Sequence, residues 1–345
     1  MADREYRKTV YCELEFLKKF RSSFPRSLGV REELVEQWWN VSRFINKAEL
    51  ELDVSKEEFL KAVKRNDYLM KVFKRGIERN IKFLNGQTAS DRCTEDTEAN
   101  TVSGLKIAYM LDINKADGQV YEQKKGIIVL TPTSWKTQEY LFGDNGSAVE
   151  KYDAEITSWK GILLNRYKLS NCNSILIIDK YLLSKDINNF NNTNLYYIFD
   201  ALLPQKLLNS KFHITIITDK KEKVNNCSKK YEIIDKGIRK LRPDLEYMFE
   251  ILCPQECPFH DRTIITNNVW IGCGAGFDLF NSRGATQNTT ITIVYPGIQN
   301  SMDWCEKAYQ TLIDKASEQA RKIKDGCGGE CFSKNSQFHN RLLSQ

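Results

Sequence analysis

The chain has 345 residues, of which 41% are hydrophobic and 28% are charged, and its formal net charge is +6. It contains no apolar run of about 18 residues, which excludes a transmembrane helix. The charged N-terminal stretch also lacks the apolar segment of a secretory signal. We therefore expect a cytoplasmic protein with reduced cysteines and one large core or two ordinary ones.

Residues 1–86 are expected to form a mainly helical N-terminal region. Residues 9–17 fit either a strand or the start of a helix. Ser55 fits an N-cap with acidic residues in the following turn, and it begins a basic amphipathic helix. Residues 56–82 carry nine Lys or Arg against four acidic residues. This excess is typical of a solvated helix face or of a surface that contacts phosphates or anionic lipid.

A polar stretch at 87–104 is predicted to be a linker. Residues 105–170 are then expected to form a small α+β region. Its apolar runs 105–113 and 126–131 flank the turn-prone segment 114–118, which favours a hairpin-like pair of strands. Helical stretches are expected from 135 to 167.

Residues 171–325 alternate apolar strands with helices, which predicts an α/β domain with a mixed or mainly parallel sheet flanked by helices. The tail at 326–345 is expected to be mobile. Strands are predicted at 174–179, 212–219, 245–252, 262–266, 269–272 and 290–295, and helices at 194–208, 231–241 and 302–324.

Ten cysteines allow a metal site to be considered. Cys253 with Cys257 and His260, and Cys327 with Cys331, have spacings that occur at zinc sites but also in ordinary loops. Packing or loop cysteines are the preferred interpretation, and we expect neither a metal nor another cofactor.

One segment contains candidate catalytic residues. His260-Asp261-Arg262 lies at the start of a predicted strand, Asn267-Asn268 follows that strand, and Trp270 lies at the start of the next one. A glycine pattern then runs through positions 272, 274 and 276. Over about residues 172–295 the sequence resembles the phospholipase D superfamily, whose signature is H-x-K, four residues and D on a strand–turn–strand unit. Arg262 stands at the lysine position and Asn267 at the aspartate position.

The segment is similar in more detail to the phospholipase-D-like C-terminal domain of MIT-domain-containing eukaryotic proteins. That domain is considered non-catalytic, associates as a dimer and binds membrane phospholipids. The matching residues are His260-Asp261-Arg262, Asn267-Asn268, Trp270, Gly274, Gly276, Asp278 and Phe280.

The resemblance implies catalytic roles for His260, Arg262 and Asn267. The family's histidine attacks phosphorus to form a phosphohistidine, and a second histidine protonates the leaving oxygen. An arginine can hold the non-bridging oxygens in place of lysine. Only one such motif is present, so a complete site would require a homodimer in which each chain gives one His260.

Further phosphate contacts are predicted at strand ends, glycines and a second basic segment. That segment, 220–242, has nine basic residues against three acidic ones. The predicted phosphate-binding residues are Asp179, Gly274, Gly276, Lys229, Lys230 and Arg239. Each also has a structural interpretation: a capping aspartate, glycines for close packing, solvated lysines, and His260 or Arg262 as hydrogen-bonded structural groups.

The favoured hypothesis is a nucleic-acid-binding protein, either a metal-independent nuclease or an accessory factor of a bacterial phage-defence system. The bacterial context follows from the Asn- and Lys-rich composition and from the resemblance. The alternative is a non-catalytic dimeric scaffold or an adaptor that binds anionic membrane phospholipid. The sequence does not identify protein partners.

Overall fold

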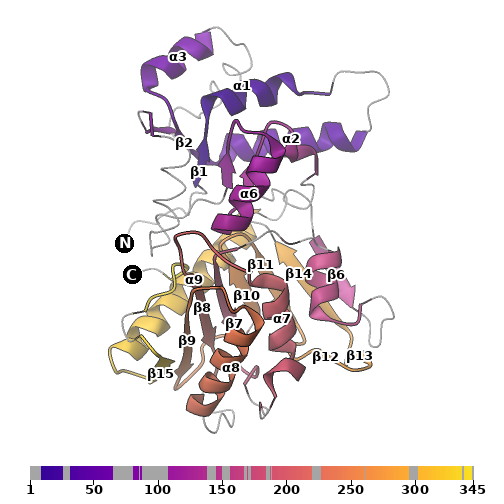
Figure 1. The fold of residues 1–345 in the computed structure, drawn as a ribbon, viewed down its shortest axis with the longest axis vertical. Coiled ribbons are helices and arrows are strands. Elements are labelled where there is room, and N and C mark those ends of the chain that lie inside the picture. Colours follow the sequence, from indigo (N-terminus) through magenta and orange to yellow (C-terminus); the bar gives the residue numbers. More distant parts are fainter. Residues whose placement is uncertain are drawn as a thin grey trace.

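The computed structural model describes residues 9–25, 32–64, 81–84, 86–87, 108–137, 145–149, 156–166, 169, 172–183, 187, 189–219, 227–260, 262–294, 302–335 and 338–343. Two units are stacked along the long axis of the molecule, each built on its own β-sheet (Figure 1). The chain is therefore a mixed α/β protein with a parallel sheet and a mixed sheet.

Sheet A is parallel, and its strands lie in the order β3-β2-β1-β4-β5. The strands are β1 (Thr9–Cys12), β2 (Glu49–Leu52), β3 (Ile81–Phe83), β4 (Ala108–Met110) and β5 (Val129–Leu130). The helices of this unit are α1 (Leu14–Ser22), α2 (Glu32–Lys47), α3 (Lys56–Lys64) and α6 (Lys115–Lys125).

The two faces of sheet A have separate cores because successive strand residues point to opposite sides. Val10 and Met110 pack with Phe20 of α1 and Trp38 of α2 on one face. The other face buries a smaller cluster with the half-buried Tyr121 of α6 against it: Tyr11, Tyr109, Leu111, Ile127 and Val129. The N-terminal region thus contains a sheet, which the expectation of a mainly helical region did not include.

The prediction of a hairpin across residues 105–131 is wrong. β4 and β5 run parallel, and α6 connects them. The side chain of Asn114 accepts a hydrogen bond from the Asp117 backbone N–H and caps the helix, while Gly126 ends it with a φ of 63°. The turn-prone residues are therefore a helix cap and not a hairpin turn.

Sheet B is mixed, and its eight strands lie in the order β15-β9-β8-β7-β10-β11-β14-β6. Strands β7, β8 and β9 are parallel to one another, and β10 and β11 form an antiparallel pair beside β7. The strands are β6 (Asn145–Val149), β7 (Ser174–Ile178), β8 (Phe212–Ile217), β9 (Tyr247–Pro254), β10 (Thr263–Thr266), β11 (Trp270–Cys273), β14 (Thr289–Val294) and β15 (Gly329–Ser333). A separate two-stranded ribbon is formed by β12 (Phe280–Asn281) and β13 (Gly284–Ala285).

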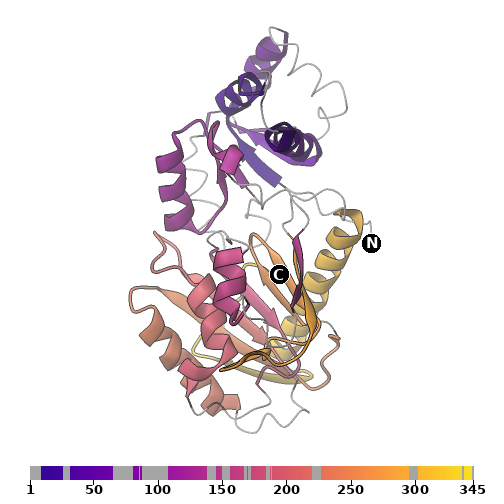
Figure 2. The ribbon, with the colours of Figure 1, turned by 90° about the vertical axis from the view of Figure 1, so that its right-hand side faces the viewer.

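Helices cover both faces of sheet B (Figure 2). Helices α7 (Asn194–Leu202) and α8 (Cys227–Leu241) pack on the face that presents Ile175 and Ile177. Helix α9 (Met302–Lys324) packs on the face that presents Leu176 and Ile178. All five β7 residues are buried, which explains why the strand carries four consecutive apolar residues, 175–178, after Ser174.

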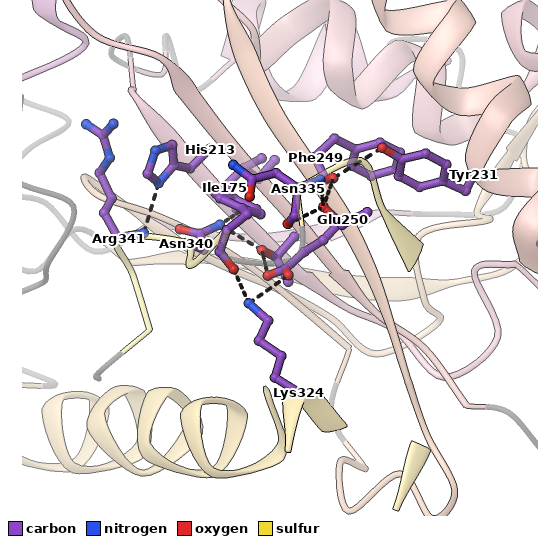
Figure 3. Close-up of polar contacts among 12 residues, drawn as sticks. Ile175, His213, Tyr231, Phe249, Glu250, Lys324, Asn335, Asn340 and Arg341 are labelled. Carbon is purple, nitrogen blue, oxygen red and sulfur yellow. Dashed lines mark hydrogen bonds and ion pairs between the residues drawn. The ribbon is translucent and has the colours of Figure 1, made fainter. Parts of the chain in front are cut away.

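The C-terminal tail differs from the mobile segment expected at 326–345. Residues 329–333 form β15 at the edge of sheet B, and residues 338–343 pack against the buried side chains of this sheet (Figure 3). Asn340 donates to Ile175 O and Thr215 Oγ1, and the Arg341 backbone N–H donates to His213 Nδ1. These buried polar contacts fix the segment in place.

The two units meet where α6 ends. Asn173 Nδ2 donates to Lys125 O, and Asn267 Nδ2 donates to Gly126 O. A Cβ on Gly126 would lie 2.3 Å from Cys172 O, so only glycine fits this approach. Of the expected linker at 87–104, all but residue 87 falls outside the described ranges. Within those ranges, no helix is long and apolar enough to cross a membrane.

Candidate phosphate-binding site

Asp179 marks the site, directly after the carboxyl end of β7. Its side chain is buried, and its two oxygens accept hydrogen bonds from the backbone N–H groups of Tyr181 (2.9 Å) and Phe277 (3.0 Å). Burial raises the pKa of Asp179, and the nearby Asp278 adds to this, whereas the two N–H groups and the charge of Arg262 oppose it. Asp179 therefore acts as a buried anchor for two loops.

Arg262 lies just before β10, whose first residue Thr263 pairs with Ile178 at the end of β7. The half-exposed guanidinium donates to Gly274 O at 2.5 Å, and its Cζ lies 5.3 Å from the centre of the Tyr181 ring. Among the residues that the structure describes, Gly274 O is its hydrogen-bond acceptor, which leaves other N–H groups for an anion.

Gly276 permits the close approach of these groups. Its φ is +85°, a conformation that favours glycine, and a Cβ there would lie 3.2 Å from Arg262 Cδ and 3.3 Å from Asp179 Oδ2. Asp179, Tyr181, Arg262, Gly274 and Gly276 thus come together, and we call this group the Arg262 edge.

The loop that carries these glycines is anchored from both sides. Trp159 Nε1 donates to Phe277 O at 2.9 Å. Asn194 at the start of α7 donates to Asp278 Oδ1 and to Phe280 O and accepts from the Phe280 N–H. The Arg262 edge is therefore backed by a hydrogen-bonded framework.

His260 lies in the loop between β9 and β10, two residues before Arg262, and its side chain is exposed. The preceding Phe259 is buried against the α9 face and anchors this loop. Asp261 lies outside the described residues.

Asn267 is not part of this group. It follows the other end of β10, about 17 Å from Arg262 along an extended strand. Its buried side chain accepts from the Asn173 N–H at 2.8 Å and donates to Gly126 O at 2.9 Å. Asn267 therefore connects sheet B to α6.

The three predicted phosphate contacts on α8 are also spread apart. Lys229 is exposed near the start of the helix, whereas the buried Lys230 donates to Leu183 O. Arg239 pairs with Asp235 at 3.3 Å near the opposite end of the helix. Of the basic segment, residues 220–226 fall outside the described ranges, as do residues 65–80 of the first basic segment.

Three residues of this region were not among the predicted site residues. Tyr181 is 40% exposed and lies beside Arg262. Lys180 Nζ lies 3.8 Å from Oδ2 of Asp219, which follows the end of β8. Asp179 comes directly after β7, and Asp219 comes two residues after the end of β8, its parallel neighbour. This pattern is the signal that could have identified the edge.

Sheet A also gathers acidic residues at its carboxyl edge, another feature that the sequence did not reveal. Asp53 Oδ1 accepts from the Leu14 N–H at 2.9 Å, and Glu13 accepts from the Asp112 N–H at 2.5 Å. Burial raises the pKa of both Glu13 and Asp53. Within the described ranges, no three side chains that could hold a metal ion come together.

Cys253 and Cys257, considered above as zinc ligands, have other surroundings. Cys253 is buried with its Sγ 3.3 Å from Cys227 Sγ, and Cys257 is half-buried beside the α9 face.

Comparison with known proteins adds no assignment. No family model matches the chain, and no curated protein matches it.

Proposed function

We propose that the C-terminal unit is a phospholipase-D-like domain that binds nucleic acid through its phosphates at the Arg262 edge. The observation that carries this proposal is the half-exposed guanidinium of Arg262, held by Gly274 O and the Tyr181 ring beside the exposed His260. A planar guanidinium with open N–H groups matches the oxygens of a phosphodiester. The antiparallel pair β10–β11 after the His260 loop also supports the proposed family.

Binding through phosphates predicts a defined salt dependence. Each phosphate contact releases counterions, so Arg262→Gln should reduce the slope of log affinity against log salt by about one. Arg283, an exposed arginine on the β12–β13 turn, provides the matched control as Arg283→Gln. Equal slopes for the two variants would contradict the proposed role of Arg262.

Cleavage is a further step of the same proposal. His260 would attack the phosphorus, a histidine from a second copy would protonate the leaving oxygen, and water would hydrolyse the phosphohistidine. The decisive experiment incubates single- and double-stranded DNA and RNA with excess EDTA and compares wild type, His260→Ala and the control His339→Ala, with binding recorded in the same tubes. Metal-independent cleavage that only His260→Ala abolishes would support a nuclease, for example in a bacterial defence system.

Binding without cleavage is the second candidate, and the position of Asn267 favours it. The residue at the family's aspartate position is buried between the two units, so it does not orient His260. The domain would then be a dimeric scaffold that reads phosphate groups on nucleic acid or on an anionic membrane. Sedimentation with vesicles that contain anionic lipid, in competition with an oligonucleotide, separates these two ligands.

A further inference from the structure

Tyr181 presents an aromatic ring at the surface of the Arg262 edge. Unlike the core aromatics, this ring is not buried. The ring follows β7 in a turn that is held by two contacts: Tyr181 N donates to Asp179 Oδ1, and Leu182 N donates to Asp179 O. The side chain is nevertheless 40% exposed. A well-anchored turn thus holds a flat apolar group in contact with solvent.

Two cations lie over this ring in cation–π contacts, and the ring keeps part of its surface in solvent. Arg262 Cζ is 5.3 Å and Lys180 Nζ is 5.6 Å from its centre. Two carboxylates of the same region lie deeper, since Asp179 is buried and the side chain of Asp219 is 6% exposed, whereas that of Lys180 is 34% exposed. Asp278 is exposed, and its Oδ1 accepts a hydrogen bond from Asn194. The surface at Tyr181 therefore combines an aromatic ring with two cations.

We propose that Tyr181 is a stacking platform for a base of single-stranded nucleic acid, while Arg262 and Lys180 contact the flanking phosphates. This inference rests on the proposed function of the Arg262 edge and specifies single-stranded nucleic acid as its ligand. Every base has a flat face that can stack on tyrosine, and the paired bases of a duplex do not offer that face. The protein should therefore prefer single strands without a strong preference for sequence.

The test compares two probes with equal numbers of phosphates. Fluorescence anisotropy is measured on the full chain with an oligothymidylate of about 12 nucleotides, within the usual site sizes, and with an abasic strand of the same length. The wild type should bind the oligothymidylate about 5- to 150-fold more tightly, the range expected for one stacked base. A duplex of equal length, whose bases are already stacked and paired, should not show this tighter binding.

Substitutions of Tyr181 then assign the difference to its ring. Tyr181→Leu should abolish the preference for the strand with bases, and Tyr181→Phe should retain it. Tyr197 of α7 is also 40% exposed, so Tyr197→Leu is the matched control and should change nothing. If Tyr181→Leu does not fold, Tyr181→Gln takes its place in the same comparison and should likewise abolish the preference.

The outcomes separate this inference from the function on which it rests. If the wild type binds both strands equally, or if Tyr181→Leu keeps the preference, the stacking platform is refuted and phosphate binding stands. If no probe binds at low salt, both proposals are refuted.

Discussion

Removal of the Lys324 ammonium should strongly destabilise the fold, because it leaves a buried carboxylate without its countercharge. Lys324 Nζ lies 2.9 Å from Glu250 Oε2, and the two side chains are 12% and 0% exposed (Figure 3). Glu250 also accepts a hydrogen bond from Thr215 Oγ1 at 2.9 Å. Lys324 in addition donates to Phe338 O, which ties α9 to the C-terminal segment.

Breaking a buried ion pair from one side costs about 3–5 kcal/mol, so Lys324→Met should lower the melting temperature by roughly 10 °C. Burial already raises the pKa of Glu250, and loss of Lys324 raises it further. The folded state then favours the protonated carboxyl more than the unfolded state does. The stability deficit relative to the wild type should therefore grow as the pH rises above the pKa of Glu250 in the folded wild type, by up to about 1.4 kcal/mol per unit, and level off above its still higher pKa in the variant.

Urea unfolding at several pH values measures this effect, and Lys322→Met is the matched control. Lys322 pairs with Glu318 on the exposed side of α9, where both side chains are 50% exposed, so its loss should cost at most about 0.5 kcal/mol. In the double variant Lys324→Met/Glu250→Gln, most of the stability should return because the amide can still accept from Thr215. If the double variant is no more stable than Lys324→Met, the unpaired charge of Glu250 is not the cause of the lost stability. The loss would then come from the missing hydrogen bond between Lys324 and Phe338 O.

Three other substitutions test the fold and the site. Gly276→Ala should destabilise by about 1–3 kcal/mol because of its positive φ, and it should weaken oligonucleotide binding because the new Cβ displaces Arg262; unchanged urea unfolding and affinity would contradict this. Asn267→Ala should cost about 2–3 kcal/mol in urea unfolding, since it leaves the Gly126 carbonyl without a donor, and should leave any phosphodiester cleavage by the remaining folded protein intact; selective loss of cleavage would instead make Asn267 catalytic. Burial lowers the pKa of His213 to about 2, so the unfolded state binds a proton below about 6.5 that the folded state refuses, and stability should fall by about 1.4 kcal/mol per pH unit below that value. His213→Gln should remove this part of the acid slope, and an unchanged slope would show that His213 is not the group responsible.

The core of sheet B was predictable because its strands are long and fully buried. Residues 174–178 and 212–217 are predominantly apolar, interrupted by Ser174, His213 and Thr215, and all of them are buried in the structure. The predicted helix 302–324 matches α9 in both of its ends. Long, apolar or periodic segments carry enough signal to specify their own secondary structure.

Sheet A escaped prediction because its strands are too short to show a period. β4 has three residues and β5 has two, and in β2 the buried Glu51 separates the apolar residues Leu50 and Leu52. The hairpin error has a related cause. Asn and Gly serve both as turn residues and as helix caps, and only the tertiary structure decides between the two at Asn114 and Gly126.

The members of the candidate site were predictable one by one but not as a group. Asp179, Arg262 and Gly276 meet because β10 pairs with both β11 and β7. The pair of β10 and β11 agrees with the strand–turn–strand unit expected at residues 262–272, whereas the pairing of β10 with β7 joins segments far apart in the sequence and was not predicted. Asn267 was grouped with Arg262 because it stands at the aspartate position of the phospholipase D signature. A strand between them separates their side chains, whereas a loop would have allowed them to meet.

The arrangement of the Arg262 edge favours phosphate binding over cleavage on physical grounds. A nucleophilic imidazole needs a partner that orients it, and in the described part of the chain His260 is exposed with no such partner, while Asn267 lies at the other end of β10. Binding needs only a positioned cation at the surface. Arg262 meets that requirement through Gly274 O and the Tyr181 ring, without any rearrangement. Cleavage would therefore depend on a second copy that reorganises the His260 loop, so the activity of a purely monomeric sample should be limited to binding.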